Sequence, residues 1–338
     1  MHIPFFSKSG PAFDKPQRGV AIITALLIVT IATTISISIS TRLQLDVRRT
    51  GNMIASDQAY LYSLLAEEFF QTLLKNEDSR QDFIEKPLIT DGIIRQIIPV
   101  ESDTAVLLEV EVTDLSACIN VNALIGSSNI QSPDLITEGR LQELFKNNGI
   151  PEELTQAIAD WIDTDLTNNI PDGAEDGFYM NQPKPYRVAN TPLQSISELR
   201  LIKGFQDKKV YQSITRLIEG RSTSSSKRFA SAALCAFNTD NNSNIPININ
   251  TASVEVLKSL QSGITQAQIE DIVQTREKNA YTKVPTLFEE QTNLVTTSSY
   301  YLLKTTVKIG NALNVMYSIV FRDGPGNTKV TYSTQRTL

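Results

Sequence analysis

The chain has 338 residues, with 31 basic and 37 acidic side chains and a formal net charge of −6. This acidic balance disfavours a protein that binds nucleic acid by neutralising phosphates. The single histidine is His2, so a chain that loses its first residues has no imidazole for Ser-His-Asp or Cys-His catalysis or for a His-containing zinc site.

The amino-terminal segment joins a short basic leader to a long apolar run. Residues 1–19 form the leader, which ends in Gly19, and residues 20–40 carry no charged side chain. At a rise of about 1.5 Å per residue, a helix over this run spans roughly 30 Å, the thickness of the hydrocarbon core of a bilayer. Because basic flanks stay in the cytoplasm, we expect most of the chain on the other side of the membrane.

The apolar run is predicted to continue as a helix well beyond Ser40. Apolar residues recur there mostly at intervals of three, four or seven, which predicts one helix over residues 20–74, apolar all round at first and amphipathic later. These residues are Leu43, Val47, Ile54, Leu61, Leu65, Phe69 and Leu73. The alternative is an ordinary secretory signal peptide, whose apolar region is shorter, about 7–15 residues.

Predicted strands lie on both sides of a long middle segment. They cover residues 93–99 and 105–112, with a turn at 101–103, and then 302–309, 315–322 and 330–333, with a turn at 324–327. We therefore divide the chain into a leader (1–19), a transmembrane and stalk helix (20–74), the first half of an α/β part (75–114), a mostly helical insertion (115–299) and the second half of the α/β part (300–338).

The insertion contains a weak internal repeat. Ile-Asn-Val-Asn at 119–122 returns as Ile-Asn-Ile-Asn at 247–250, and each copy is followed by a helix, a Gly-Ile turn with a capping residue and another helix. The asparagines suit turns that are fixed by bonds to nearby backbone. The second copy also resembles helix-hairpin-helix modules, some of which hold DNA, but its hairpin has only Gly263 where those modules have Gly-X-Gly.

The junction between Gly19 and Val20 resembles a type IV prepilin leader, which is cut after the glycine so that the apolar helix stays with the mature protein. In that family the fifth mature residue is generally Glu, whose carboxylate faces the amino group of a neighbouring subunit; in this chain the fifth residue after Gly19 is Thr24. An unpaired charge in an apolar core is costly, and a subunit at the top of a filament has no upper neighbour whose amino group its acid could neutralise. A subunit without this acid therefore suits the top of a filament. Within the pilin-like class, this pattern resembles the K minor pseudopilin family of type II secretion systems.

The resemblance implies an α+β fold of the type IV pilin kind, in which a long amino-terminal helix packs with an antiparallel sheet. In this family a large, mostly α-helical domain is inserted into that fold, which agrees with the division of the chain given above.

Carboxylates gather in the segment between Asp160 and Glu198. Asp163 and Asp165 end an apolar helix, and Glu175 follows a Gly-rich turn, so several hard oxygen ligands are available to one calcium ion. The spacing is not that of an EF-hand, because the sixth and twelfth places lack Gly and Glu. The alternative is a solvated acidic loop that caps two helices.

The order of motifs in this segment, Trp-Ile-Asp-X-Asp, Gly-Ala-Glu-Asp, Asn-X-Pro-Leu and Ser-Glu-Leu, resembles the K pseudopilins, whose inserted domain binds calcium. The resemblance implies Asp163, Asp165, Glu175 and Asp176 as calcium ligands, with Thr191 or Glu198 as weaker candidates.

Cys118 and Cys235 are the only cysteines, too few for a thiolate metal cluster. In an oxidising periplasm they can pair as a disulfide; the alternative is two buried free thiols, and the sequence leaves both open.

The resemblance further implies a non-enzymatic subunit at the tip of the pseudopilus, which initiates its assembly and supports export of folded proteins across the outer membrane. The chain would cross the inner membrane once, with a cytoplasmic amino terminus and a periplasmic bulk. The implied partners are the I- and J-type minor pseudopilins, the major pseudopilin, the prepilin peptidase, the inner-membrane assembly platform and membrane lipid, and no nucleic acid is expected. Two alternatives remain: a membrane-anchored helix-hairpin-helix DNA receptor of the competence type, and an anchored periplasmic hydrolase, for which the chain shows no catalytic pair.

Overall fold

The structure is a computed structural model that describes residues 18–76, 93–98, 106–125, 134–219, 232–238, 245–324 and 326–335. The leader up to residue 17 and the predicted turn at 101–103 lie outside these residues. The chain forms two compact units, Met1–Ala55 and Ser56–Leu338.

The described elements follow the predicted order. The α-helices are α1 (Arg18–Asn76), α2 (Leu135–Asn147), α3 (Leu154–Ile162), α4 (Asp176–Tyr179), α5 (Lys208–Glu219), α6 (Val254–Ser259) and α7 (Gln266–Lys278). Short 3-10 helices are η2 (Leu115–Ala117), η3 (Val121–Leu124), η4 (Ile196–Leu201) and η6 (Thr286–Phe288). The strands are β1 (Ile93–Ile98), β2 (Val106–Asp114), β3 (Ile119–Asn120), β4 (Leu234–Cys235), β5 (Ile247–Asn248), β6 (Leu294–Val295), β7 (Tyr300–Ile309), β8 (Ala312–Arg322) and β9 (Thr328–Thr334). The predicted long helix and the five predicted strands outside the insertion are confirmed, with bounds that differ by a few residues.

The first unit consists of the amino-terminal part of α1, in which Gly19 and Val20 occupy the first turns. Among the described residues, α1 is the one helix long and apolar enough to cross a membrane, and its side chains in this part are exposed. The hydroxyl of Thr24 donates to the carbonyls of Val20 (3.1 Å) and Ala21 (3.0 Å), so its hydrogen bond is made within its own helix. This segment is a candidate membrane anchor.

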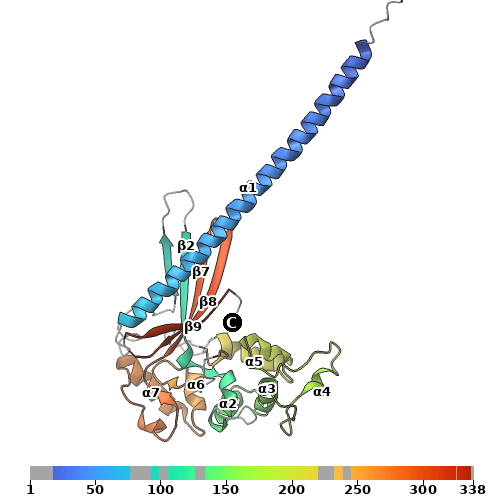
Figure 1. Ribbon diagram of the computed structural model, residues 1–338. Helices are drawn as coiled ribbons and strands as arrows, with labels where there is room; N and C mark the ends of the chain where they lie inside the picture. Colours follow the sequence, from blue (N-terminus) through green and yellow to red (C-terminus); the bar gives the residue numbers. More distant parts are fainter. Residues whose placement is uncertain are drawn as a thin grey trace, which may run out of the picture. The chain divides into compact units, whose positions relative to one another are not determined.

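The second unit contains a five-stranded antiparallel sheet in the order β1-β2-β7-β8-β9. Strands β2 and β7 are direct neighbours, paired from Val106 with Ile309 to Asp114 with Tyr301. Residues 115–299 therefore leave the sheet at the end of one strand and rejoin it at the start of the strand beside it (Figure 1). A helix, an antiparallel sheet and an insertion between two paired strands make up the α+β fold that was predicted.

The carboxyl-terminal part of α1 packs on the sheet, but not through the large apolar residues from which its amphipathic character was predicted. Leu65 and Phe69 are 58% and 61% exposed, whereas Phe70 is 2% exposed and meets the ring of Tyr301 edge-on, with centroids 6.4 Å apart. The sheet-facing residues are Ala59, Ser63, Ala66, Phe70 and Leu74. Small side chains at three of these five positions let the helix backbone approach the sheet closely, so a pattern search for large residues finds the opposite face.

The insertion has a core of its own, built from two modules of similar backbone plan. In the first, β3 pairs in parallel with β4 and is followed by α2 and α3; in the second, β5 pairs in parallel with β6 and is followed by α6 and α7. Gly149 (φ 67°) and Gly263 (φ 79°) make the turns between the paired helices in the left-handed conformation that favours glycine.

One detail of the predicted repeat is wrong. Thr265 caps α7 through a capping box with Gln268, whereas Glu153 precedes α3 without a side-chain cap. The capping residue is thus present in the second module alone. Helix α3 is buried at nearly every position, so tertiary packing stabilises its start without a cap.

Candidate metal centre

Three carboxylates converge where α3 ends. Asp163 is the carboxyl-terminal cap of α3, its N–H bonded to the carbonyl of Ala159 at 2.9 Å, and Asp165 and Glu175 join it from the following loop. One ligand oxygen from each of the three lies within 4.8 Å of the others. Calcium–oxygen distances are about 2.3–2.6 Å, so oxygens on opposite sides of one ion are roughly 5 Å apart, and the spacing suits a single ion.

The oxygens of this group lack the partners that buried acceptors require. Oδ1 of Asp163 and both carboxylate oxygens of Glu175 are buried without a hydrogen bond, and within the described part of the chain no lysine or arginine forms an ion pair with the three acids. Burial, followed by repulsion from the neighbouring carboxylates, raises the pKa of Asp163 to about 7 and that of Glu175 to about 7. Asp163 also lies at the negative end of the α3 dipole. A divalent cation would satisfy these oxygens and balance their charge, so the donor set fits calcium.

The loop that carries the acids is folded around a fourth carboxylate, that of Asp160. Asp160 is fully buried and accepts from the backbone N–H of Asn169 at 3.1 Å and from its side-chain amide at 2.5 Å. Burial raises the pKa of Asp160, while the hydrogen bonds from Asn169 and Ala174 lower it in part. Gly173 lies so close that a Cβ there would collide with the Asp160 carboxylate and with the backbone of Asn169. Glycine is therefore required at 173 for the loop to close over Asp160.

Sequence reasoning missed Asn190 as a ligand candidate. Its Oδ1 is buried without a partner, while its Nδ2 donates to the carbonyl of Asp165 at 3.4 Å, so the amide lies beside the acidic group. Its φ of 47° is a backbone conformation that asparagine tolerates better than most residues. Amide oxygens bind calcium, so Asn190 is a further candidate ligand.

The other predicted ligands have different surroundings. Asp176 accepts from the N–H of Val188 at 3.0 Å, and Glu198 accepts from the N–H groups of Gln194 (2.8 Å) and Ser195 (3.1 Å) in a capping box at the start of η4. Asp176 and Glu198 do not belong to the converging group of three. Thr191 is exposed in the loop that follows Asn190.

The repeated asparagines clamp distant loops in the same way in both modules. The amide of Asn122 exchanges two hydrogen bonds with the backbone of Leu193, each 2.9 Å, and the amide of Asn250 does the same with Tyr281 at 2.9 and 2.8 Å. Each pair closes the segment that follows the second helix of its module. In the first module that segment carries the acidic group, so Asn122 helps to hold the candidate metal centre in place.

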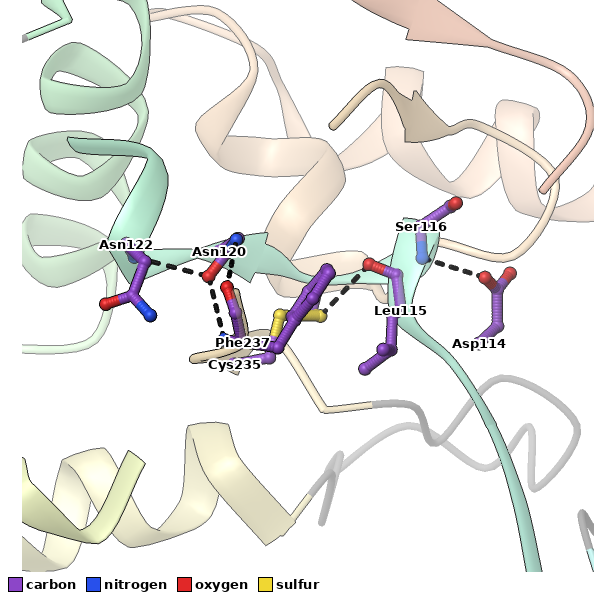
Figure 2. Close-up of a disulfide and its surroundings, with 8 residues drawn as sticks. Asp114, Leu115, Ser116, Asn120, Asn122, Cys235 and Phe237 are labelled. Carbon is purple, nitrogen blue, oxygen red and sulfur yellow. Dashed lines mark hydrogen bonds between the residues drawn. A yellow bond between two sulfur atoms is a disulfide. The ribbon is translucent and has the colours of Figure 1, made fainter. Parts of the chain in front are cut away.

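The first asparagine of the first module fixes the segment that follows β4. The Asn120 amide donates to the carbonyl of Phe237 at 3.0 Å and accepts from its N–H at 3.2 Å (Figure 2). Beside this pair, Cys118 and Cys235 form a disulfide with a Cα–Cα distance of 5.9 Å (Figure 2). Of the two alternatives that the sequence left open, the structure has the bonded pair.

Comparison with known proteins agrees with this architecture. Two family models, both described as type II secretion system (T2SS), protein K, match residues 117–219 and 247–306, one for each module. Type II secretion system protein K of Pseudomonas aeruginosa is 29% identical over 333 residues, covering 94% of this chain and 92% of that protein. The Aeromonas hydrophila protein K is 32% identical over 205 residues, covering 56% and 60%.

A solved structure has the same fold. A chain of the GspK-GspI-GspJ complex from enterotoxigenic Escherichia coli aligns with a TM-score of 0.57 and 23% identity, covering 85% of this chain and 98% of that one. A long amino-terminal helix on an antiparallel sheet, with an inserted domain of two asparagine-clamped modules, defines a minor pseudopilin. The chain belongs to the protein K family of type II secretion systems.

Proposed function

We propose that this protein is a non-enzymatic subunit at the tip of the type II secretion pseudopilus, where it initiates assembly and supports export of folded proteins across the outer membrane. It is anchored in the inner membrane by the apolar part of α1, with a cytoplasmic leader that the prepilin peptidase removes after Gly19 and with its bulk in the periplasm. The major pseudopilin and the inner-membrane assembly platform are further partners of the assembling filament.

The observation that carries the tip position is the residue at 24. The Thr24 hydroxyl donates its hydrogen bond to carbonyls of its own helix, and residue 24 has no carboxylate for a subunit above it. A subunit below the tip needs such an acid to neutralise the amino terminus of its neighbour, whereas a terminal subunit would leave it unpaired in an apolar surrounding.

The partner surface is the exposed face of α1 in the second unit. Leu61, Leu65 and Phe69 are spaced by four residues and are 57–61% exposed, so they form one apolar stripe on the side away from the sheet-facing residues. The helices of I- and J-type minor pseudopilins suit this stripe, and the structural neighbour is a chain from a complex of that composition.

Two substitutions at one position test the tip assignment. Thr24→Val removes the hydroxyl but keeps the shape, and we expect secretion and recovery of the I- and J-type partners to match the wild type. Thr24→Glu adds an acid without a partner, and we expect fewer complexes. If Thr24→Glu assembles as well as the wild type and Thr24→Val does not, the tip assignment is wrong.

We further propose a structural calcium ion bound by Asp163, Asp165 and Glu175, with the side-chain oxygen of Asn190 as an additional ligand. The orphaned, mutually repelling oxygens support this site, and the ion would tie the acidic loop to the end of α3. Calorimetric titration of the full-length protein with calcium should show binding that Glu175→Gln weakens. Absence of calcium binding by the wild type would exclude the ion, and it would leave the tip assignment unaffected. The roles of Asp176, Thr191 and Glu198 as ligands stay predictions.

A DNA receptor is not favoured by the described residues. The turn of the second module has the single Gly263, and Glu270 and Asp271 are exposed on α7 immediately after it. Carboxylates at this place repel phosphates.

A further inference from the structure

The place where the inserted domain joins the sheet is organised around one partly buried acid, Asp114. Asp114 is the last residue of β2, where the chain leaves the sheet, and its Oδ2 accepts from the hydroxyl of Ser298, two residues before the chain returns in β7, at 2.5 Å. The same oxygen accepts from the hydroxyl of Thr251 in the second module at 2.6 Å. Its Oδ1 accepts from the N–H of Ser116 at 2.8 Å (Figure 2). We call Asp114, Ser116, Thr251 and Ser298 the neck.

The neck is continuous with the framework of the second module. The Ser298 hydroxyl accepts from the side-chain amide of Asn248 at 2.7 Å, and the Oδ1 of Asn248 accepts from the N–H of Asn250 at 2.9 Å. The hydroxyl of Ser116 accepts from the N–H of Ser299 at 3.3 Å, which joins the outgoing and returning chain a second time. One carboxylate thus connects the sheet, both ends of the insertion and the asparagine clamp of the second module.

The partners of Asp114 can serve either charge state of the acid. Two of them are hydroxyls, which both donate and accept hydrogen bonds, so protonated Asp114 can donate to one of them where the ionised form only accepts. Asp114 is partly buried, and desolvation of its carboxylate is the main reason that its pKa is raised, while the three hydrogen bonds lower it in part. The neutral form therefore keeps a bonded network and avoids the cost of a buried charge.

The adjoining strands carry further charged and titratable groups. Glu111 of β2 and Lys304 of β7 pair with each other at 3.1 Å, and Tyr301 of β7 donates its hydroxyl to a neck carbonyl, that of Ser298, at 3.4 Å. Arg322 of β8 donates its backbone N–H to the carbonyl of Ser299 at 2.8 Å. Burial, opposed in part by hydrogen bonding, accounts for the raised pKa of Asp114.

We propose that Asp114 is a clasp between the inserted domain and the sheet, and that the clasp tightens as the surroundings become acidic. The sign follows from linkage. A carboxyl group that binds its proton more tightly in the folded state stabilises that state fully below its unfolded pKa of 3.8, and this contribution is lost as the pH rises through the higher folded value. Each unit of difference between the two values changes the local opening equilibrium about tenfold.

Hydrogen exchange of the full-length protein in detergent tests this proposal. We expect peptides over residues 114–119 and 245–253, after correction for intrinsic rates, to open more often at about pH 8 than at about pH 5 in the wild type. Asp114→Asn, which is neutral at every pH, should keep these peptides protected and abolish the pH dependence. Asp114→Ala should open them at both pH values.

The control is Asp207→Asn, because Asp207 is an exposed carboxylate that caps α5 through the N–H of Lys209. This variant should keep the wild-type pH dependence at the neck. The proposal is overturned if Asp114→Asn retains the wild-type pH dependence, or if the wild type shows none. Should Asp114→Ala fail to fold, the Asp114→Asn comparison decides alone.

Discussion

Removal of the Cys118–Cys235 disulfide is expected to destabilise the inserted domain strongly. The bond joins residues 117 positions apart, so it constrains a long loop of the unfolded chain. In the chain-entropy description, closure of a loop of this length contributes about 5 kcal/mol at 25 °C. For a unit of this size we expect the melting temperature to fall by about 10 °C.

The double variant Cys118→Ala/Cys235→Ala avoids burial of an unpaired hydroxyl at these positions. Urea unfolding can be followed by the fluorescence of Trp161, the only tryptophan, which is 2% exposed in the core of the inserted domain and lies 5.2 Å from the ring of Tyr179. The wild type treated with a reductant should unfold at the midpoint of the double variant. An unchanged midpoint in both would refute the reasoning, because the loop would then not be closed in the folded protein.

Three further predictions concern the candidate metal centre and α1. A calcium chelator should destabilise the wild type, and so lower its melting temperature, by about 3 kcal/mol when free calcium was a hundredfold above the dissociation constant. It should have no effect on the double variant Asp163→Asn/Glu175→Gln. An equal shift of the melting temperature in that variant would place the ion elsewhere. Gly173→Ala should weaken calcium binding because the added Cβ displaces the acidic loop, and unchanged affinity by calorimetry would contradict this. Phe70→Ala should lower the free energy of unfolding in urea by about 3–5 kcal/mol, because Phe70 is buried against the sheet. Phe69→Ala should leave that free energy near the wild-type value and reduce co-purification with the I- and J-type partners, because Phe69 is exposed. The reverse result would mean that the two faces of α1 have been assigned the wrong way round.

The parts of the fold that could be predicted are those whose signal is local. The apolar run that begins at Val20 and the strands around Val110 and Leu303 follow from composition and periodicity, and the Asn-X-Asn repeats marked both modules. What was missed depends on contacts between distant segments. The face of α1 that meets the sheet is lined by small residues such as Ala66, and only the sheet itself selects that face.

The candidate metal centre shows the same division. Asp163, Asp165 and Glu175 are the three of the six predicted ligands that converge, and they could be identified because they are acids in a recognisable motif. Asn190 was missed because a single neutral amide has no charge signal, and its place beside Asp165 depends on the long loop between them. The neck at Asp114 has no sequence signature either, since Thr251 and Ser298 come from positions more than a hundred residues away.

Amino-terminal sequencing of the membrane-extracted protein tests the central claim most directly. In cells that contain the prepilin peptidase, the mature chain should begin at Val20 and keep the whole apolar part of α1; in cells without the peptidase it should retain residues 1–19. A mature chain that begins beyond Ser40, or that keeps its leader within assembled pseudopili, would contradict the account.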